Sequence, residues 1–219
     1  MCQQVLRLAG NQLTSIPDDT FKSLGNLHAL ELAANQLEDL PQKVLSPLRA
    51  LHRLGASHNQ LHTLDQHALA NCSDLRELEL AANRFAKISS ELLATVPRLE
   101  LLDLSGNQLE LLPLFPALPA LTVLKVSDNR IASVSRDNLS KLSGLRMLDL
   151  SENGLNTVEH GALSKNTRLE GLRIDANNLV DLDGILTGAP PSLYAVNASD
   201  NQLQHFDFAR LPGEFLWPC

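Results

Sequence analysis

The chain has 219 residues, a formal net charge of −7 and an isoelectric point near 5.4. Because no run of lysine or arginine occurs along it, nucleic acid and anionic membrane surfaces are disfavoured as partners. No stretch approaches the roughly 18–20 uninterrupted apolar residues that a membrane span requires. Aromatic residues make up only 4% of the chain, so aliphatic side chains must build the core.

Repeat asparagines recur along the whole chain at intervals of 24 residues, with one interval of 22. Each lies in the frame LxxLxLxxNxLxxL, as in the segment from Leu27 to Leu40. The LxL part predicts a short strand whose two leucines point to one side, because successive side chains alternate across a strand. A second apolar pair, such as Phe21 and Leu24, is expected to close each coil from behind. The nine positions are Asn11, Asn35, Asn59, Asn83, Asn107, Asn129, Asn153, Asn177 and Asn201.

This period predicts a solenoid, because no single repeat can bury its own leucines and neighbours must stack into one continuous core. We expect an α/β fold of about nine repeats, with a curved parallel β-sheet on the concave face and loops and short helical turns on the convex face. The asparagine amides are expected to pair backbone groups that the turns leave inside the core. The short interval contains Pro113, Pro116 and Pro119, which predict an extended back segment because proline disfavours helix.

Residues 1–219 are predicted to form this single solenoid, with no linker. A solenoid needs polar caps at its ends, yet the repeats start almost at residue 1 and the chain stops within an expected strand at Trp217. We therefore expect a fragment that lacks its caps and any signal peptide or membrane anchor. Cys2 and Cys219 would lie too far apart to bridge each other. Cys72 occupies a leucine position and is expected to be a buried core residue.

Residues two, four and six positions before each repeat asparagine are expected to face solvent on the concave side. Carboxylates gather in the middle of this face, on neighbouring strands about 5 Å apart, and basic residues follow. We expect a protein partner with a basic patch opposite repeats 4 and 5; the alternative is a merely solvated face with contacts elsewhere. The candidate protein-binding residues are Glu31, Glu77, Glu79, Glu100, Asp103, Lys125, Arg146, Asp149, Arg173 and Tyr194.

No catalytic residue, cofactor or metal site is predicted. The carboxylates lie on an open sheet, so their pKa values are expected to stay near ordinary ones, and no hydrolase, phosphate-loop or paired CxxC motif occurs. His28, His52 and His58 cluster early in the chain but lack the ligand spacing of a zinc site. We interpret them as solvated surface histidines. A pH-responsive patch is the alternative, because histidine titrates near neutral pH.

Three N-glycosylation triplets begin at Asn71, Asn138 and Asn197, slightly more than the roughly two expected by chance. Asn71 and Asn138 fall on the back half of their repeats, where sugar would be tolerated. Asn197 falls in the central concave column, where a glycan would cover the end of the sheet. If Asn197 is bare, Tyr194 becomes a candidate aromatic anchor for a partner.

The 24-residue spacing, the triplets and the form xIPxxxFxxLxxL of the first repeat, with Ile16, Pro17 and Phe21, resemble the extracellular, typical class of animal leucine-rich repeats. A narrower stretch is similar to a late ectodomain repeat of insect Toll-type receptors. It runs over residues 197–212, Asn-Ala-Ser-Asp-Asn-Gln-Leu-Gln-His-Phe-Asp-Phe-Ala-Arg-Leu-Pro, and is followed by Trp217. The chain departs from that pattern at Pro218, where the next strand should continue.

The Toll-type resemblance implies a cell-surface glycoprotein receptor of innate immunity or development. Its solenoid would bind a protein ligand, such as a secreted cystine-knot cytokine or another cell-surface protein, with a receptor dimer as one arrangement. Membrane attachment would come only through the missing anchor, so we expect the extracellular side of the plasma membrane, or secretion. The alternatives are a secreted leucine-rich repeat protein of immunity or matrix that acts by complex formation, and an intracellular scaffold.

Overall fold

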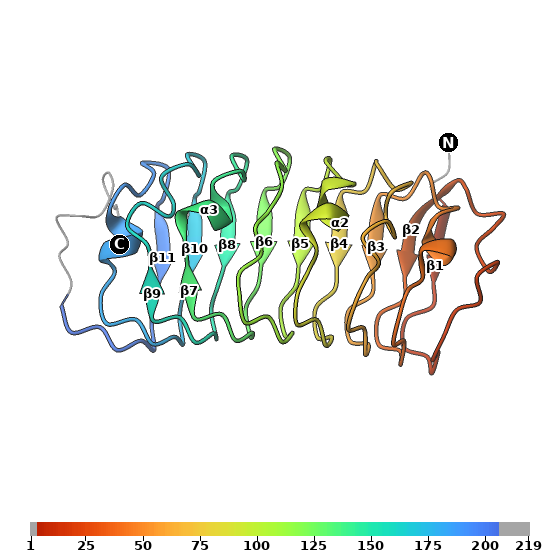
Figure 1. The fold of residues 1–219 in the computed structure, drawn as a ribbon, viewed down its shortest axis with the longest axis horizontal. Helices are drawn as coiled ribbons and strands as arrows, with labels where there is room; N and C mark the ends of the chain where they lie inside the picture. The colour runs from red at the N-terminus through yellow and green to blue at the C-terminus, as the bar shows by residue number, and fades with distance from the viewer. Residues whose placement is uncertain (1–3, 206–219) are drawn as a thin grey trace, which may run out of the picture.

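Nine strands, one from each repeat, form a single parallel sheet that runs along the long axis of the molecule (Figure 1). This computed structural model of the chain describes residues 4–205, and its sheet confirms the solenoid predicted from the 24-residue period. The strands, in the order in which they pair, are β1 (Gln4–Arg7), β2 (Leu27–Glu31), β3 (Arg53–Gly55), β4 (Glu77–Glu79), β5 (Leu101–Asp103), β6 (Val123–Lys125), β8 (Met147–Asp149), β10 (Gly171–Arg173) and β11 (Ala195–Asn197).

Short elements cover the other side of the coil. The two-residue strands β7 (Ser133–Val134) and β9 (Thr157–Val158) pair with each other in parallel. The helices are α1 (Gln42–Leu45), α2 (Ser90–Ala94), α3 (Arg136–Leu139) and α4 (Asp183–Leu186). Residues 112–118 contain no helix, as their prolines predict. Between residues 4 and 205, no helix is long and apolar enough to cross a bilayer.

The strand register aligns equivalent residues of successive repeats in columns. Leu30 pairs with Leu54, and Leu54 pairs in turn with Leu78. All three leucines are completely buried, so the core is one continuous stack, as expected for repeats that cannot bury their apolar side chains alone. The same register fixes which solvent-facing residues become neighbours on the opposite side of the sheet.

The repeat asparagines hold the turns that follow the strands, as predicted. The Nδ2 of Asn83 donates hydrogen bonds of 3.0 Å to the carbonyl oxygens of Ala56 and Leu80, and its Oδ1 accepts one of 2.9 Å from the Leu61 amide. The preceding residue, Ala82, has a left-handed backbone with φ of 52°. One amide therefore pairs backbone groups of two successive coils at a sharp turn.

Two buried residues interrupt the leucines on the back of the core. Cys72 has no exposed surface, and burial raises the pKa of its thiol to about 11, which confirms it as a core residue. Asn166 is equally buried, a feature that the repeat pattern did not single out. Its Nδ2 donates hydrogen bonds of 3.0 Å to the carbonyl oxygens of Leu139 and Leu142. Asn166 thus joins two successive coils much as the repeat asparagines do.

Several expectations concern residues outside the range that the structure describes. Cys2 and Cys219 lie outside residues 4–205, as do Trp217 and the part of the Toll-type stretch that begins at Phe206. Their expected roles remain predictions from the sequence.

Candidate functional site

The candidate binding surface is the solvent-facing side of the nine-stranded sheet, hereafter the sheet face. Seven of the ten candidate residues lie on its strands, and the register places Glu79 beside Asp103 on neighbouring strands. Glu100, Arg146 and Tyr194 instead come directly before β5, β8 and β11. They form part of a second column, along the edge where the strands begin.

An arginine that the sequence analysis did not propose lies at the centre of the acidic strands. Nη1 of Arg53 is 3.2 Å from Oε2 of Glu77, and its Nη2 is 2.9 Å from Oε1 of Glu79. Its Nε lies 2.9 Å from Oε1 of Glu31 but is not aligned as a hydrogen-bond donor. Gly55 makes room for this contact, because a Cβ at that position would overlap the Glu31 carboxylate. We call these four charged residues, together with Asp103, the acidic region.

The acidic region changes the titration of one of its members. Desolvation by burial raises the pKa of Glu79, and the Arg53 guanidinium opposes this rise, while the charges of Glu31, Glu77 and Asp103 add to it. The expectation that every carboxylate on an open sheet keeps its ordinary pKa is therefore wrong at Glu79. Its side chain is only 30% exposed, which accounts for the desolvation.

The basic residues that follow the acidic region are already paired with acids. Nζ of Lys125 lies 3.5 Å from Oδ2 of Asp103, and Nη1 of Arg173 lies 3.2 Å from Oδ2 of Asp149. Across β2 to β6 and the residues directly before these strands, the carboxylates exceed the cations by two. These residues are Glu31, Glu77, Glu79, Glu100 and Asp103 against Arg53, Arg76 and Lys125.

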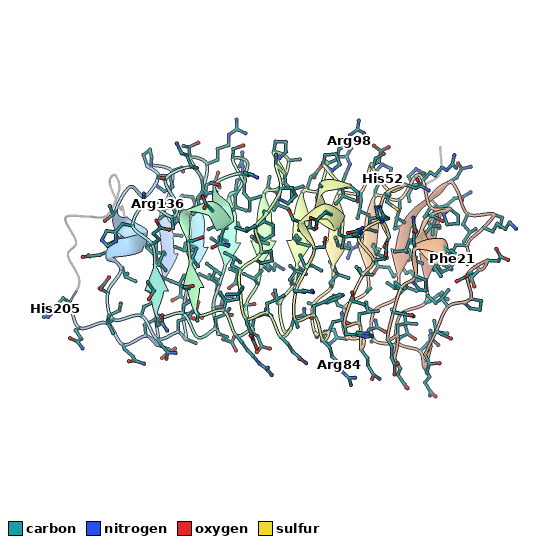
Figure 2. The ribbon with its side chains drawn as sticks, viewed as in Figure 1. Phe21, His52, Arg84, Arg98, Arg136 and His205 are labelled. Carbon is teal, nitrogen blue, oxygen red and sulfur yellow. The ribbon has the colours of Figure 1, made fainter. Side chains whose placement is uncertain are left out.

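Two of the early histidines are brought together, and the third is not. The rings of His28 and His52 stack with centroids 5.1 Å apart and planes 4° from parallel. Figure 2 shows His52 toward the edge of the molecule where Arg98 lies, whereas Arg84 lies at the opposite edge. His58 follows β3 in the turn before Asn59. Within residues 4–205, no three His, Cys, Asp or Glu side chains are grouped to hold a metal ion.

The three glycosylation triplets differ in accessibility. Asn197, which ends β11 on the sheet face, is exposed. Asn71 is also exposed, and its Nδ2 donates a hydrogen bond of 2.9 Å to the carbonyl oxygen of Ser46 at the surface. Asn138 is only 8% exposed, and its Nδ2, the atom to which a glycan is attached, donates a hydrogen bond of 2.7 Å to the carbonyl oxygen of Leu112. A sugar on Asn138 would break this contact and displace the back of the coil, so the structure argues against the expected tolerance there.

Known proteins with this architecture share its fold at low sequence identity. Residues 4–61, 57–109 and 119–179 match the family described as leucine rich repeat, whereas no curated protein sequence matches the chain. The structure of the TLR13–ssRNA13 complex superposes with a TM-score of 0.80 at 25% identity, over 86% of this chain and 27% of that one. The leucine-rich repeat domain of APL1B gives a TM-score of 0.78 at 26% identity, over 94% and 60%.

A leucine-rich repeat protein of Leptospira interrogans has the same fold, with a TM-score of 0.78 at 23% identity over 92% of this chain and 56% of that one. The chain thus spans less than two thirds of each of these three proteins. The family match covers most of the chain and agrees with the stacked coils and the paired asparagine turns. The chain therefore belongs to the leucine-rich repeat family.

Proposed function

We propose that this chain is a protein-recognition module that binds a basic patch of its partner through the acidic region of the sheet face. The observation that carries the proposal is the register of β4 and β5, which sets Glu79 directly beside Asp103. Arg53 offsets part of the negative charge, but a surplus of two carboxylates remains on this half of the face. A complementary basic surface would be steered toward it and held in register.

Binding without catalysis is the function that this geometry supports best. Arg53 engages both Glu77 and Glu79, so neither carboxylate is free to act as a general acid or base without breaking an ion pair. An open sheet also lacks the walls that would exclude water from a reacting group. We accordingly propose that no reaction takes place on the sheet face.

We further propose that the module is part of the ectodomain of a Toll-like cell-surface receptor in innate immunity or development. The fold similarity to TLR13 and the sequence likeness of residues 197–212 support this role, and the exposed Asn71 and Asn197 suit an extracellular setting. The second candidate is a secreted leucine-rich repeat protein that acts in complexes, and it would present the same sheet face to its partner. A secreted or cell-surface protein is the proposed ligand in both cases.

The TLR13 structure contains single-stranded RNA, which makes RNA the competing ligand class. RNA binding requires cations to neutralise phosphates. The acidic region of this chain is negatively charged and would repel the phosphates. We therefore favour a protein over a nucleic acid.

A charge-reversal experiment tests the acidic region. The probe is a decalysine peptide, and binding is measured by fluorescence anisotropy at low and physiological salt, with a single-stranded RNA of similar length in parallel. We expect salt-dependent binding of the peptide, at least tenfold weaker for Glu77→Lys with Glu79→Lys, and no binding of the RNA.

The matched control is Glu38→Lys with Glu110→Lys, which changes the net charge equally at two exposed residues outside the strands. Equal losses in both double variants would show that net charge, and not the acidic region, governs binding. Tighter binding of RNA than of decalysine would overturn the proposed ligand class. Mass spectrometry of the natural protein tests the extracellular setting, and bare Asn71 and Asn197 would contradict it.

A further inference from the structure

One column of the sheet face is charged on only two of the nine described strands. The position six residues before the repeat asparagine is charged on β3 and β4, where it is Arg53 and Glu77. From β5 onward the same position carries no charge. Its residues, hereafter the apolar column, are Leu101, Val123, Met147, Gly171 and Ala195.

Met147 is the most prominent member of the apolar column. Its side chain is large and flexible, yet the residue remains 43% exposed. It lies across Gly171 on the next strand, where an added Cβ would come within 2.6 Å of the Met147 sulfur. Beside it is a shallow hollow of about 300 Å³, lined in part by Val123, Lys125 and Arg173. The absence of a side chain at Gly171 therefore gives Met147 room to lie flat and to adapt to a partner.

The charged residues around the apolar column are engaged in ion pairs with one another. Arg173 contacts both Asp149 and Asp175 at 3.2 Å. On the edge where the strands begin, Nη1 of Arg146 lies 3.1 Å from Oε1 of Glu170. The result is an exposed apolar centre within a self-paired polar rim, which is the arrangement that concentrates binding energy in protein interfaces.

We infer that the apolar column is a docking site for an uncharged apolar side chain of the same partner whose basic group contacts the acidic region. This inference rests on the proposed function and specifies its ligand further. The ion-paired rim favours a neutral group at Met147, whereas the acidic region favours a cation. Both lie on one continuous sheet, and β4 and β8 are three strand spacings apart, or about 15 Å. The partner therefore presents a basic group and a leucine- or phenylalanine-sized side chain at that separation.

Methionine methyl signals offer a direct test, because Met147 and Met1 are the only two methionines of the chain. The full chain is labelled with ¹³C at the methionine methyl groups and titrated with a peptide of two arginines, four Gly/Ser residues and an amidated phenylalanine. In extended form this spacer covers about 15 Å, at roughly 3.3 Å per residue. We expect a saturable shift of the Met147 signal, with the Met1 signal unchanged.

Two altered peptides separate the apolar contact from the charge contact. With alanine in place of phenylalanine, the peptide should no longer shift the Met147 signal. Shortening the spacer to one residue should weaken binding at least fivefold. No shift of Met147 up to millimolar peptide, or the same shift with the alanine peptide, would overturn the inference. So would concentration-dependent broadening of Met147 without peptide, which would indicate a second copy of the chain on the column.

Variants of the protein separate this inference from the proposed function. Met147→Asp should lower the affinity for the phenylalanine peptide at least tenfold, whereas Met147→Leu should change that affinity less than twofold. Gly171→Ala should also lower the affinity, because the added methyl group displaces the Met147 side chain. Unchanged circular dichroism and urea midpoints would establish that these variants are folded. Loss of binding in Glu77→Lys with Glu79→Lys, but not in Met147→Asp, would refute the apolar column and leave the proposed function standing.

Discussion

The two sides of the same strands obey different rules. On the core side, Leu78 of β4 and Leu102 of β5 occupy equivalent positions and are both completely buried. On the solvent side of the same strands, the central column changes from Glu79 to Asp103 and then to Lys125 on β6. Each coil packs against near copies of itself, so volume and hydrogen bonding must repeat. The solvent side needs only compatible charges, and that freedom lets it carry the binding specificity.

The largest expected effect is a difference in stability loss between two adjacent residues of β5, one on the core side and one on the solvent side. Leu102→Ala removes a completely buried side chain and should lower the free energy of unfolding by about 2–5 kcal/mol. Asp103→Ala, one residue later, should lower it by a smaller amount, about 1 kcal/mol, because it removes a partly buried ion pair with Lys125 and a hydrogen bond from the Ser105 amide but no core volume. Urea unfolding followed by circular dichroism measures both. Similar losses for the two variants would refute the division between the sides.

The turn asparagines show that buried hydrogen bonds, like core volume, must repeat from coil to coil. Asn83→Leu should leave the Leu61 amide and the Ala56 carbonyl without their side-chain partner. Each unpaired buried group costs about 1–3 kcal/mol. The control is Asn26→Leu at an exposed position directly before β2, away from the asparagine turns, for which we expect no comparable loss. The same urea titration applies, and equal stability of the two variants would show that the asparagine contacts contribute nothing.

Two glycines allow a close contact with the backbone to be compared with a close contact with a side chain. A Cβ at Gly184 would overlap the carbonyl group of Val158, which cannot move freely, so Gly184→Ala should destabilise the fold by about 1–3 kcal/mol. A Cβ at Gly55 would overlap only the end of the Glu31 side chain, which can rotate away. Gly55→Ala should therefore have a smaller effect on the thermal midpoint. A larger shift for Gly55→Ala would contradict this reasoning.

The smallest expected effect concerns pH. Because the pKa of Glu79 is raised in the folded chain, the folded state still holds a proton at pH values where the unfolded state has lost it. Stability should therefore fall as the pH rises through the interval between the ordinary and the raised pKa. Glu79→Gln should remove this part of the pH dependence, as measured by urea midpoints across the weakly acidic range. An unchanged slope in Glu79→Gln would show that another group is responsible.

Much of the fold follows from the sequence pattern, whereas the chemistry of the sheet face does so only in part. The strand positions, the role of the repeat asparagines and the burial of Cys72 all follow from a period that every coil repeats. Arg53 was overlooked because its three carboxylate partners lie on the two neighbouring coils, 22 to 26 residues away in the chain. Asn166 was overlooked because a single polar residue at a leucine position resembles a surface substitution.

The sequence by itself determined that this chain stacks 24-residue coils, because nine aligned copies of one apolar and amide pattern permit no other way to bury their leucines. Only the tertiary structure decided which solvent-facing charges meet and which apolar residues line up. Those contacts depend on strand register and on the reach of long side chains such as Arg53 and Met147. Register sets residues of different coils about 5 Å apart, and at that distance burial and charge pairing, which no single repeat encodes, shape the surface offered to a partner.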